Sequence, residues 1–490
     1  MILTSGMQSQ IRSRPIVSLT LAFFLVIGVW SILTPLFAGP DEPANYIKGA
    51  AIIRGVLVGE DVEPTSALSY WSTRIEIPYE YGVAMQVPWC FVPMPNTPAC
   101  NRPMESLTPE EKPITNMGRY PPIGFVTTGL GSLIGPNDLS VRCGRLLNSL
   151  LGSLLLAIGC TLLTASRRSA IAILATTTPG VLFLSSVNSP SGIEIAASIC
   201  LWSAMYSVFT SHETSILTKS GFVFSGSLVI LVRPVGSIIY LITLAIGVIA
   251  YQKSSSWKSK IRDLLLPITI HLLSILTSAV WYFKIYNFHL AQSIVDQRTL
   301  PSLLDIVEQS INDLSVKIGE SIGNYGWLDT PSPTFVVWFF IALVAIIIAR
   351  NWQILANRNR VALISITLFV PIFMILLNLN YQNLLAAYGV QGRHLTPLIV
   401  GIPIIGGAIW NPKDATRRIV LISWTLSGFS CGAFALRRYS VGIQPLNFRT
   451  MFTQPVWQPM LGVAGTLCAL AVALIVFGTI FYTVATKELK

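Results

Sequence analysis

Runs of about 17 to 25 apolar residues recur from one end of this chain to the other. A helix rises about 1.5 Å per residue, so a run of this length can cross roughly 30 Å of hydrocarbon. The composition agrees, because 52% of the 490 residues are hydrophobic and only 11% are charged, with a mean hydropathy of +0.63. Ordinary soluble domains carry roughly 25% charged residues. The sequence therefore predicts a membrane protein and excludes a soluble one.

The predicted fold class is an all-α polytopic membrane protein with about 11 to 13 transmembrane helices, because a helix satisfies all of its backbone groups inside the lipid. The net charge of +11 therefore does not indicate nucleic acid as a partner. The predicted spans lie at about residues 16–37, 141–164, 169–187, 192–210, 220–232, 235–251, 263–286, 334–350, 361–379, 394–410, 418–436 and 459–483.

The first apolar run, 16–37, follows two basic residues, Arg12 and Arg14, as a secretory signal peptide would. It is longer than the roughly 7 to 15 residues of a signal-peptide core, and no clear cleavage site precedes Gly39-Pro40. We expect a retained span that follows a cytoplasmic segment, 1–15.

The distribution of basic residues among the segments between the predicted spans identifies the cytoplasmic side of the membrane. About half of the 33 Lys and Arg residues fall in segments on the side of the N-terminus, which predicts that both termini, including the tail 484–490, are cytoplasmic.

The apolar stretch 221–251 is interrupted by Arg233-Pro234. We interpret it as two short helices that meet at the outer face, since a single tilted span would put the basic run 253–262 outside.

Two long segments are then extracytoplasmic, 38–140 and 287–333. Loops of such length usually carry function. In the first, residues 44–58 have apolar side chains near one helical face, which predicts an amphipathic helix on the membrane surface. The apolar stretch 121–135 is too short to cross comfortably and predicts a re-entrant or interfacial helix. The predicted transmembrane helices after the first loop form two groups, 141–286 and 334–483, which the second outer segment separates.

Only two of the seven cysteines, Cys90 and Cys100, fall in the first outer loop. They flank a proline-rich stretch, so we expect a disulfide formed in an oxidising compartment. The other five lie inside predicted spans without metal-binding spacing.

An acidic pair, Asp41-Glu42, follows the first span directly within the sequence Gly39 to Pro43. One interpretation is helix capping, because an acid before a proline supports the next helix's N-terminus. One acid would suffice for that role. Two adjacent acids at a lipid boundary also indicate a functional site.

Glu194 and Arg233 lie at predicted outer ends of spans. Ser191 and Glu194 have the spacing of a capping box, and the alternative for Glu194 is a polar contribution to an outer cavity. Arg233 either extends to the interface or holds an anion such as a phosphate where the helix is broken.

The sequence Gln391-Gly392-Arg393-His394 opens a later span, and several polar residues precede it. This polar clustering exceeds what a turn needs. Arg393 and His394 could contact a phosphate or pyrophosphate, or serve as an interfacial anchor.

Aromatic residues stand beside polar groups at Tyr120 and in the sequence Trp327-Leu328-Asp329. Such rings can stack on sugars, but Trp and Tyr also form belts at membrane interfaces. The sequence has no P-loop, nucleophile elbow or metal-binding His cluster, so chemistry driven by cytosolic nucleotides is not expected. No internal repeat of the kind found in many transporters is present.

Several short motifs in a fixed order resemble a bacterial membrane family catalogued as domain of unknown function 2142, especially its actinobacterial members, over about residues 20 to 410. Family members often carry His at the position of Asn45 and Tyr at the position of His394. The motifs are Pro40-Asp41-Glu42-Pro43-Ala44, Tyr120-Pro121-Pro122, Asn188-Ser189-Pro190-Ser191-Gly192-Ile193-Glu194, Arg233-Pro234, Gly326-Trp327-Leu328-Asp329 and Gln391-Gly392-Arg393.

That family in turn resembles the GT-C superfamily of polytopic glycosyltransferases, which use lipid-linked sugars outside the cytoplasm. The resemblance implies a GT-C-like fold with a large first outer loop that contains a surface helix. It also implies that an acid just after the first span acts as a base or metal ligand, the place that Asp41 and Glu42 occupy. A divalent cation, Mg²⁺ or Mn²⁺, is therefore a candidate cofactor, and the bacterial plasma membrane, with an extracytoplasmic active face, is the expected location.

The expected function is transfer of a sugar, a hexose or pentose, from a polyprenyl-phosphate donor to a cell-envelope glycan or glycolipid. Because the phosphate leaves as a stable anion, such an enzyme needs a base and cationic stabilisation. Asp41 would be the base, with Glu42 assisting, and Arg393, Arg233 and His394 would hold the phosphate. The residues expected to contact the substrate are Tyr120, Glu194, Trp327, Asp329 and Gln391.

Two alternative hypotheses use the same residues. In a transporter or flippase of lipid-linked glycans, the arginines would bind phosphate without bond making. In a non-catalytic scaffold of envelope synthesis, the outer residues would serve partner assembly. Membrane lipids are partners under all three hypotheses.

Overall fold

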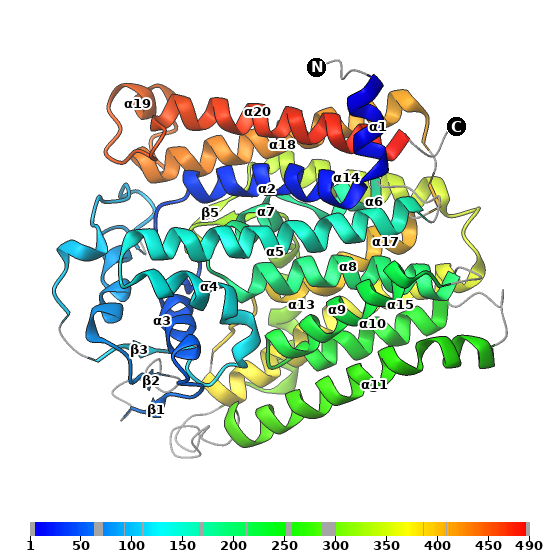
Figure 1. Cartoon of the computed structure of the whole chain (residues 1–490), viewed down its shortest axis with the longest axis horizontal. Helices are drawn as coiled ribbons and strands as arrows, with labels where there is room; N and C mark the ends of the chain where they lie inside the picture. The colour runs from blue at the N-terminus through cyan, green and yellow to red at the C-terminus, as the bar shows by residue number, and fades with distance from the viewer. Residues whose placement is uncertain are drawn as a thin grey trace.

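The structure is a computed structural model whose mostly helical chain confirms the predicted class of helical membrane protein (Figure 1). Residues 287–299 of the second outer segment and residues 487–490 of the C-terminal tail lie outside the residues that the structure describes. The described residues are 5–62, 72–92, 94–109, 112–165, 171–210, 214–250, 257–286, 300–385, 387–407, 409–410 and 412–486.

Eight of the described helices are long and apolar enough to cross a membrane by length and composition, and each coincides with a predicted span. They are α2 (Pro15–Leu33), α5 (Asp138–Ala165), α8 (Pro190–Thr210), α11 (Trp257–Trp281), α14 (Thr334–Asn351), α15 (Asn357–Leu385), α18 (Asp414–Val441) and α20 (Gly462–Ala485).

The other four predicted spans are short or broken helices. Prolines and glycines interrupt two of them, because a proline lacks the N–H that continues a helix. The broken pairs are α6 (Ile171–Thr176) with α7 (Pro179–Ser186), and α16 (Gly392–Ile399) with α17 (Gly401–Gly407). The short helices are α9 (Ile216–Val232) and α10 (Gly236–Ala250).

The predicted break at Arg233-Pro234 is confirmed. Helix α9 ends at Val232, α10 begins at Gly236, and the two helices pack against each other. The stretch is therefore a helical hairpin and not one tilted helix.

The long helices run side by side, and the short N-terminal helix α1 (Ser5–Ser13) lies beside the last turn of α20 (Figure 1). Arg12 Nε donates to the carbonyl oxygen of Thr483 at 3.4 Å. Helix α3 (Glu42–Ile53) and three short strands lie at the opposite end of the bundle, which we call the loop end. Both described chain ends are thus on one side, and the long first loop is on the other.

The first loop folds into a compact cap of short elements. Strands β1 (Glu60–Asp61), β2 (Thr73–Arg74) and β3 (Ile114–Thr115) form an antiparallel sheet in the order β1-β2-β3, which the sequence did not indicate because each strand has only two residues. The remaining loop elements are η2 (Tyr79–Met85), η3 (Val87–Cys90), η4 (Met104–Ser106), η5 (Pro122–Phe125), α4 (Val126–Gly131) and η6 (Ser132–Ile134).

The expected disulfide is present in this cap. Cys90 and Cys100 are joined, with their Cα atoms 6.3 Å apart. The elements η5, α4 and η6 correspond to the short apolar stretch that was expected not to span the membrane, and they pack against α3 and α5.

Helix α3 is present where an amphipathic helix on the membrane surface was predicted, but it is enclosed by other parts of the protein. All residues from Glu42 to Ala51 are buried, because the loop folds over the helix. Lys48 is fully buried, and its Nζ donates to the carbonyl oxygens of Leu57 at 2.6 Å and Gly118 at 2.7 Å. This amine ties α3 to the segment that follows it and to the more distant Gly118.

Burial lowers the pKa of Lys48 from 10.5 to about 7. Between these values the unfolded chain holds a proton that the folded chain lacks, so stability rises with pH across this window, by at most about 1.4 kcal/mol per pH unit. Thermal unfolding of the purified protein at pH 7.5, 8.5 and 9.5 measures this rise. Lys48→Met is expected to flatten the pH dependence, and an equal rise in this variant would contradict the assignment.

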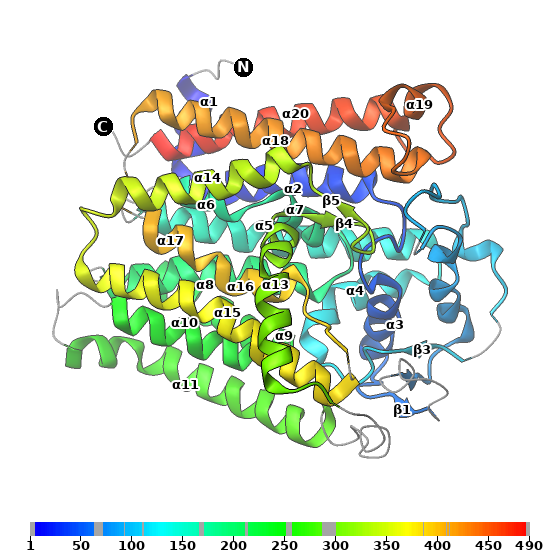
Figure 2. The same cartoon turned by 180° about the vertical axis from the view of Figure 1, so that it is seen from behind.

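The second outer segment contains a helix that the sequence analysis did not predict, α13 (Leu303–Ile322), followed by the hairpin of β4 (Asn324–Tyr325) and β5 (Thr330–Pro331). Ser302 caps it, accepting from the N–H of Asp305 at 3.2 Å, while the Asp305 carboxylate accepts from the N–H of Ser302 at 2.9 Å. Helix α13 runs across the direction of the long helices and packs on α15 and α16 (Figure 2).

Candidate functional site

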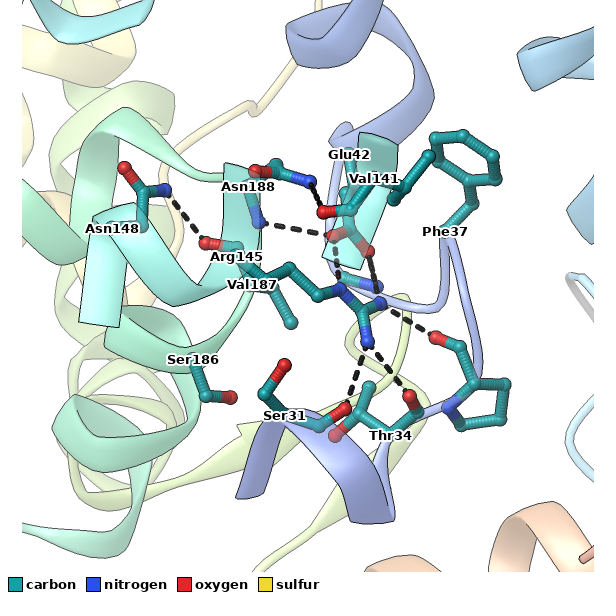
Figure 3. A network of polar contacts seen from close by, with 12 residues as sticks. Ser31, Thr34, Phe37, Glu42, Val141, Arg145, Asn148, Ser186, Val187 and Asn188 are labelled. Atoms are coloured by element: carbon teal, nitrogen blue, oxygen red, sulfur yellow. Dashed lines mark hydrogen bonds and ion pairs between the residues drawn. The ribbon is translucent and has the colours of Figure 1, made fainter. Parts of the chain in front are cut away.

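Glu42 forms a buried ion pair with Arg145 of α5, and neither side chain is exposed to solvent (Figure 3). Arg145 Nε and Nη2 donate to the two carboxylate oxygens at 2.6 and 2.7 Å. The same guanidinium donates to the carbonyl oxygens of Ser31, Thr34 and Pro35 at 2.7 to 3.1 Å. Arg145 therefore fixes the turn that leads from α2 into the loop.

The Glu42 carboxylate also accepts two backbone hydrogen bonds. The N–H of Asn188 donates to Oε1 at 3.0 Å, and the N–H of Gly39 donates to Oε2 at 3.1 Å. Each carboxylate oxygen therefore has two donors, which leaves little capacity for another ligand. Glu42 joins the first loop to α5 and to the turn before α8.

Asp41 points away from this network. Its backbone adopts a left-handed conformation with φ of 57°, which Asp tolerates better than most residues. The Asp41 Oδ2 atom accepts from Arg393 Nη2 at 2.6 Å, and 28% of the side chain is exposed, compared with 8% for Arg393. The adjacent acids therefore have different environments, one sealed and one accessible.

Asp41 lines a cavity of about 530 Å³ at the loop end. Its other walls come from the cap and from the β4–β5 hairpin, including the tryptophans Trp89 and Trp327. Such a volume is within the roughly 300–1,000 Å³ of ligand sites in proteins. The cavity gives a ligand access to the carboxylate.

A second group of polar side chains lies behind Asp41 and Arg393. Arg233 Nη1 donates to Ser191 Oγ at 3.0 Å and lies 3.5 Å from Glu194 Oε2, while its Nη2 is 3.5 Å from His394 Nε2. The capping box expected for Ser191 and Glu194 is replaced by these contacts with Arg233. We call Arg233, Arg393 and His394 the cationic cluster.

The protonation of His394 follows from its contacts. The backbone N–H of Gln391 lies 3.2 Å from His394 Nδ1, which therefore accepts. In a neutral ring, Nε2 then carries the proton, and it faces a guanidinium that is also a donor. Two donors that face each other in this way would both be satisfied by an acceptor such as a phosphate oxygen.

Buried polar atoms around the cationic cluster lack hydrogen-bond partners among the described residues. Buried polar groups in folded proteins nearly always have hydrogen-bond partners, so several unpaired polar atoms around one cluster indicate a ligand or ordered water. They are Arg393 Nε, Arg233 Nε, Glu194 Oε1 and Gln391 Oε1.

Three tyrosines are associated with the cationic cluster. The Tyr381 ring stacks on His394 with centroids 6.1 Å apart, and the rings of Tyr120 and Tyr286 meet edge to face at 5.3 Å. Electrostatic interactions couple all three phenol groups to Arg233. Tyr120 thus lies near the cluster.

Trp327 and Asp329 have separate surroundings. Trp327 lines the cavity, and its Nε1 donates to the carbonyl oxygen of Phe37 at 2.9 Å. Asp329 Oδ2 accepts from Nη2 and Nε of the buried Arg438 in α18 at 2.7 and 3.1 Å. Asp329 is therefore held by a protein cation.

Sequence reasoning missed Arg145 and Arg438. Each is a basic residue close to the loop end of a long helix, opposite to the side where the basic residues collect. An arginine that departs from the positive-inside pattern needs a buried acidic partner, and this signal could have identified both residues.

The residues expected to hold a divalent cation do not fit a metal site. Both oxygens of Glu42 have protein donors, and Asp41 is paired with Arg393. Within the part of the chain that the structure describes, no group of three or more His, Cys, Asp or Glu residues could hold a metal ion. We therefore assign no metal chemistry to this pair.

Comparison with known proteins places this chain among membrane proteins. None of the curated proteins matches it. ArnT from Cupriavidus metallidurans in the apo state is similar over 96% of this chain and 76% of that chain, with 14% identity and a TM-score of 0.48. The same protein bound to undecaprenyl phosphate is similar over 99% of this chain and 77% of that chain, with 13% identity and a TM-score of 0.46. Residues 23–402, more than half of the chain, match the family described as "Predicted membrane protein (DUF2142)", and the protein therefore belongs to this family.

Proposed function

We propose that this protein is a membrane glycosyltransferase that transfers a sugar from a polyprenyl-phosphate carrier to a cell-envelope glycan or glycolipid. The ion pair between Asp41 and Arg393 carries the proposal. It joins an accessible carboxylate at a cavity to a buried cationic cluster with unpartnered donors. The loop end would be the extracytoplasmic face, and both termini would be cytoplasmic.

The cationic cluster suits a phosphate group. Arginine presents a planar fork of donors that matches phosphate oxygens, and two arginines with the His394 N–H supply several donors within one small region. Among the residues that the structure describes, Glu194 and Asp41 are the acids that offset their charge through ion pairs. A bound phosphate would satisfy Nε of both arginines.

Transfer requires a proton acceptor next to this cluster. The carboxylate of Asp41 would remove the proton from an acceptor hydroxyl while that oxygen bonds to the anomeric carbon of the donor. The bond from the anomeric carbon to the phosphate oxygen would break, and the polyprenyl phosphate would leave with the electron pair as an anion. Arg393 and Arg233 would stabilise the added negative charge.

The other expected site residues have supporting roles in this proposal. Glu42 positions Asp41 through Arg145 and does not contact substrate, because its oxygens are occupied. Glu194 would orient Arg233, and Tyr120 and Gln391 would border the donor phosphate and sugar. Asp329 would position the Trp327 hairpin through Arg438.

Replacing Arg393 by glutamine is expected to lower kcat/KM for a polyprenyl-phosphate sugar at least 100-fold, because the buried cation faces both the phosphate and the base. Membranes containing the variant are incubated with radiolabelled polyprenyl-phosphate hexoses and pentoses, and new glycosidic linkages are counted. Arg418→Gln, which changes an arginine exposed near the cytoplasmic end of α18, is the control and should retain activity.

The same assay separates the alternatives. Movement of labelled carrier across vesicles without new linkages would contradict the enzyme and favour a flippase. If Arg393→Gln and Asp41→Asn both kept full transfer, the proposed site would be wrong.

A further inference from the structure

We propose that the cavity at Asp41 binds a neutral carbohydrate chain between Trp89 and Trp327, and that Arg438 holds both tryptophans in place. The assignment of this carbohydrate as the acceptor substrate rests on the proposed function. Binding of the carbohydrate does not depend on that function, and it can be measured without any transfer reaction.

The two tryptophans are suited to sugar rings. Trp89 is 62% exposed although it is a large apolar residue, and it lines the cavity together with Trp327. Trp327 is fixed by its hydrogen bond to Phe37. An indole face packs against the C–H groups of a sugar ring, while the ring's hydroxyl groups remain free to bind polar neighbours.

The remaining lining groups supply such polar neighbours. Gln86 and Asn116 line the same cavity, and their side-chain amides can donate to and accept from hydroxyl groups. Among the described lining residues, the charged ones are Asp41, paired with Arg393, and Lys112, paired with Glu76 at 2.6 Å. A lining with its charges already paired favours a neutral glycan over an acidic one.

The position of the cavity indicates how the ligand enters. Its described lining belongs to residues 41–44, 72–92 and 112–116 of the first loop and to the hairpin that carries Trp327. None of these residues belongs to a long apolar helix. The ligand therefore approaches from water at the loop end, and the geometry favours a glycan chain over a lipid embedded in the membrane.

One buried guanidinium connects the two walls. Arg438 Nη1 donates to the carbonyl oxygen of Thr97 at 2.6 Å, and its Nη2 donates to those of Phe91 and Met94 at 3.2 Å. These residues follow Trp89 within the disulfide loop. The same group holds Asp329, two residues after Trp327.

A buried arginine carries a large desolvation cost unless all its donors are paired. Arg438 is fully buried, and its three nitrogens all have partners. It is a positioning residue, since it fixes the spacing of Trp89 and Trp327 without lining the cavity itself.

Calorimetric titration of the full chain in lipid nanodiscs tests the binding site. The probes are neutral hexasaccharides of glucose, mannose, galactose and arabinose, with hexagalacturonate as an acidic comparison. At least one neutral probe should bind, and more tightly than the acidic one. Trp89→Ala and Trp327→Ala should each weaken its binding at least tenfold. Trp338→Ala removes a tryptophan that is 64% exposed on the apolar helix α14, and it should leave binding unchanged.

Arg438→Lys tests the positioning role. This variant keeps a cation next to Asp329 but cannot reach three carbonyl oxygens as well. We expect at least a fivefold higher Kd for the bound probe in protein that elutes as a folded monodisperse species, and Trp89→Ala should then add little to the loss. If the losses of binding free energy caused by Arg438→Lys and Trp89→Ala were fully additive in the double variant, the positioning role of Arg438 would be overturned.

Failure of this inference differs from failure of the proposed function. If no neutral probe binds, or if binding survives in both tryptophan variants, the carbohydrate site is wrong even where transfer is observed. If probes bind as expected and Asp41→Asn binds them equally well while no transfer is detected with any donor, the site stands and the enzyme proposal fails.

Discussion

Replacing Asp41 by asparagine is expected to lower glycosyl transfer by about 100-fold to 10,000-fold, the usual contribution of a general base. Asparagine keeps an oxygen that can accept from Arg393 but cannot take a proton. Because Asp41 is partly exposed and lies beside a sealed network that does not use its side chain, the protein should still fold. Initial rates are measured with labelled polyprenyl-phosphate sugars.

The matched control for this prediction is Glu80→Gln. Glu80 is an exposed acid of the same loop that does not line the cavity. Its loss should leave transfer unchanged. Equal rates for Asp41→Asn and wild type would remove Asp41 from the mechanism.

Replacing Arg145 by methionine should cause the largest loss of stability of any single change considered. The variant leaves the Glu42 carboxylate buried without its cation, and breaking such a pair costs about 3–5 kcal/mol. Three carbonyl oxygens at the end of α2 lose their donors as well. Thermal unfolding in detergent should show a large decrease in Tm.

Two further variants make this prediction specific. Arg142→Met changes an arginine one turn earlier, with a partly exposed side chain, and should have a small effect. Adding Glu42→Gln to Arg145→Met should recover part of the lost stability, because the unpaired charge is removed. A double variant less stable than the sum of the single changes would contradict a charge-pair origin.

Much of the fold could be predicted from hydropathy alone. Apolar length identified the eight long helices, and Arg233-Pro234 identified the hairpin of α9 and α10. Helix α13 was missed because it lies in a segment interpreted as an outer loop. The burial of α3 could not be predicted, since its apolar residues near one face suggested a helix on the membrane surface and the cap that covers it has few regular elements.

The candidate site was predictable by residue type and not by contact. Asp41, Arg233 and Arg393 were selected as polar residues at outer span ends, yet nothing in the sequence indicates that Asp41 contacts a residue more than 350 positions away. The separation of Asp41 from Glu42 was equally hidden, because it depends on the left-handed backbone at Asp41 and on Arg145. The local sequence shows which polar residues are present at the outer ends of the helices. Which of these residues contact each other depends on how the helices pack.

The proposed transfer requires that a polyprenyl phosphate binds at the cationic cluster next to Asp41. A cryo-electron microscopy structure of the full chain in nanodiscs with decaprenyl phosphate tests it most directly. We expect phosphate density at about 3 Å from the guanidinium groups of Arg393 and Arg233, with the Asp41 carboxylate at the edge of the same site and facing the cavity. Phosphate density elsewhere on the bundle, with the Asp41–Arg393 pair unchanged, would contradict it.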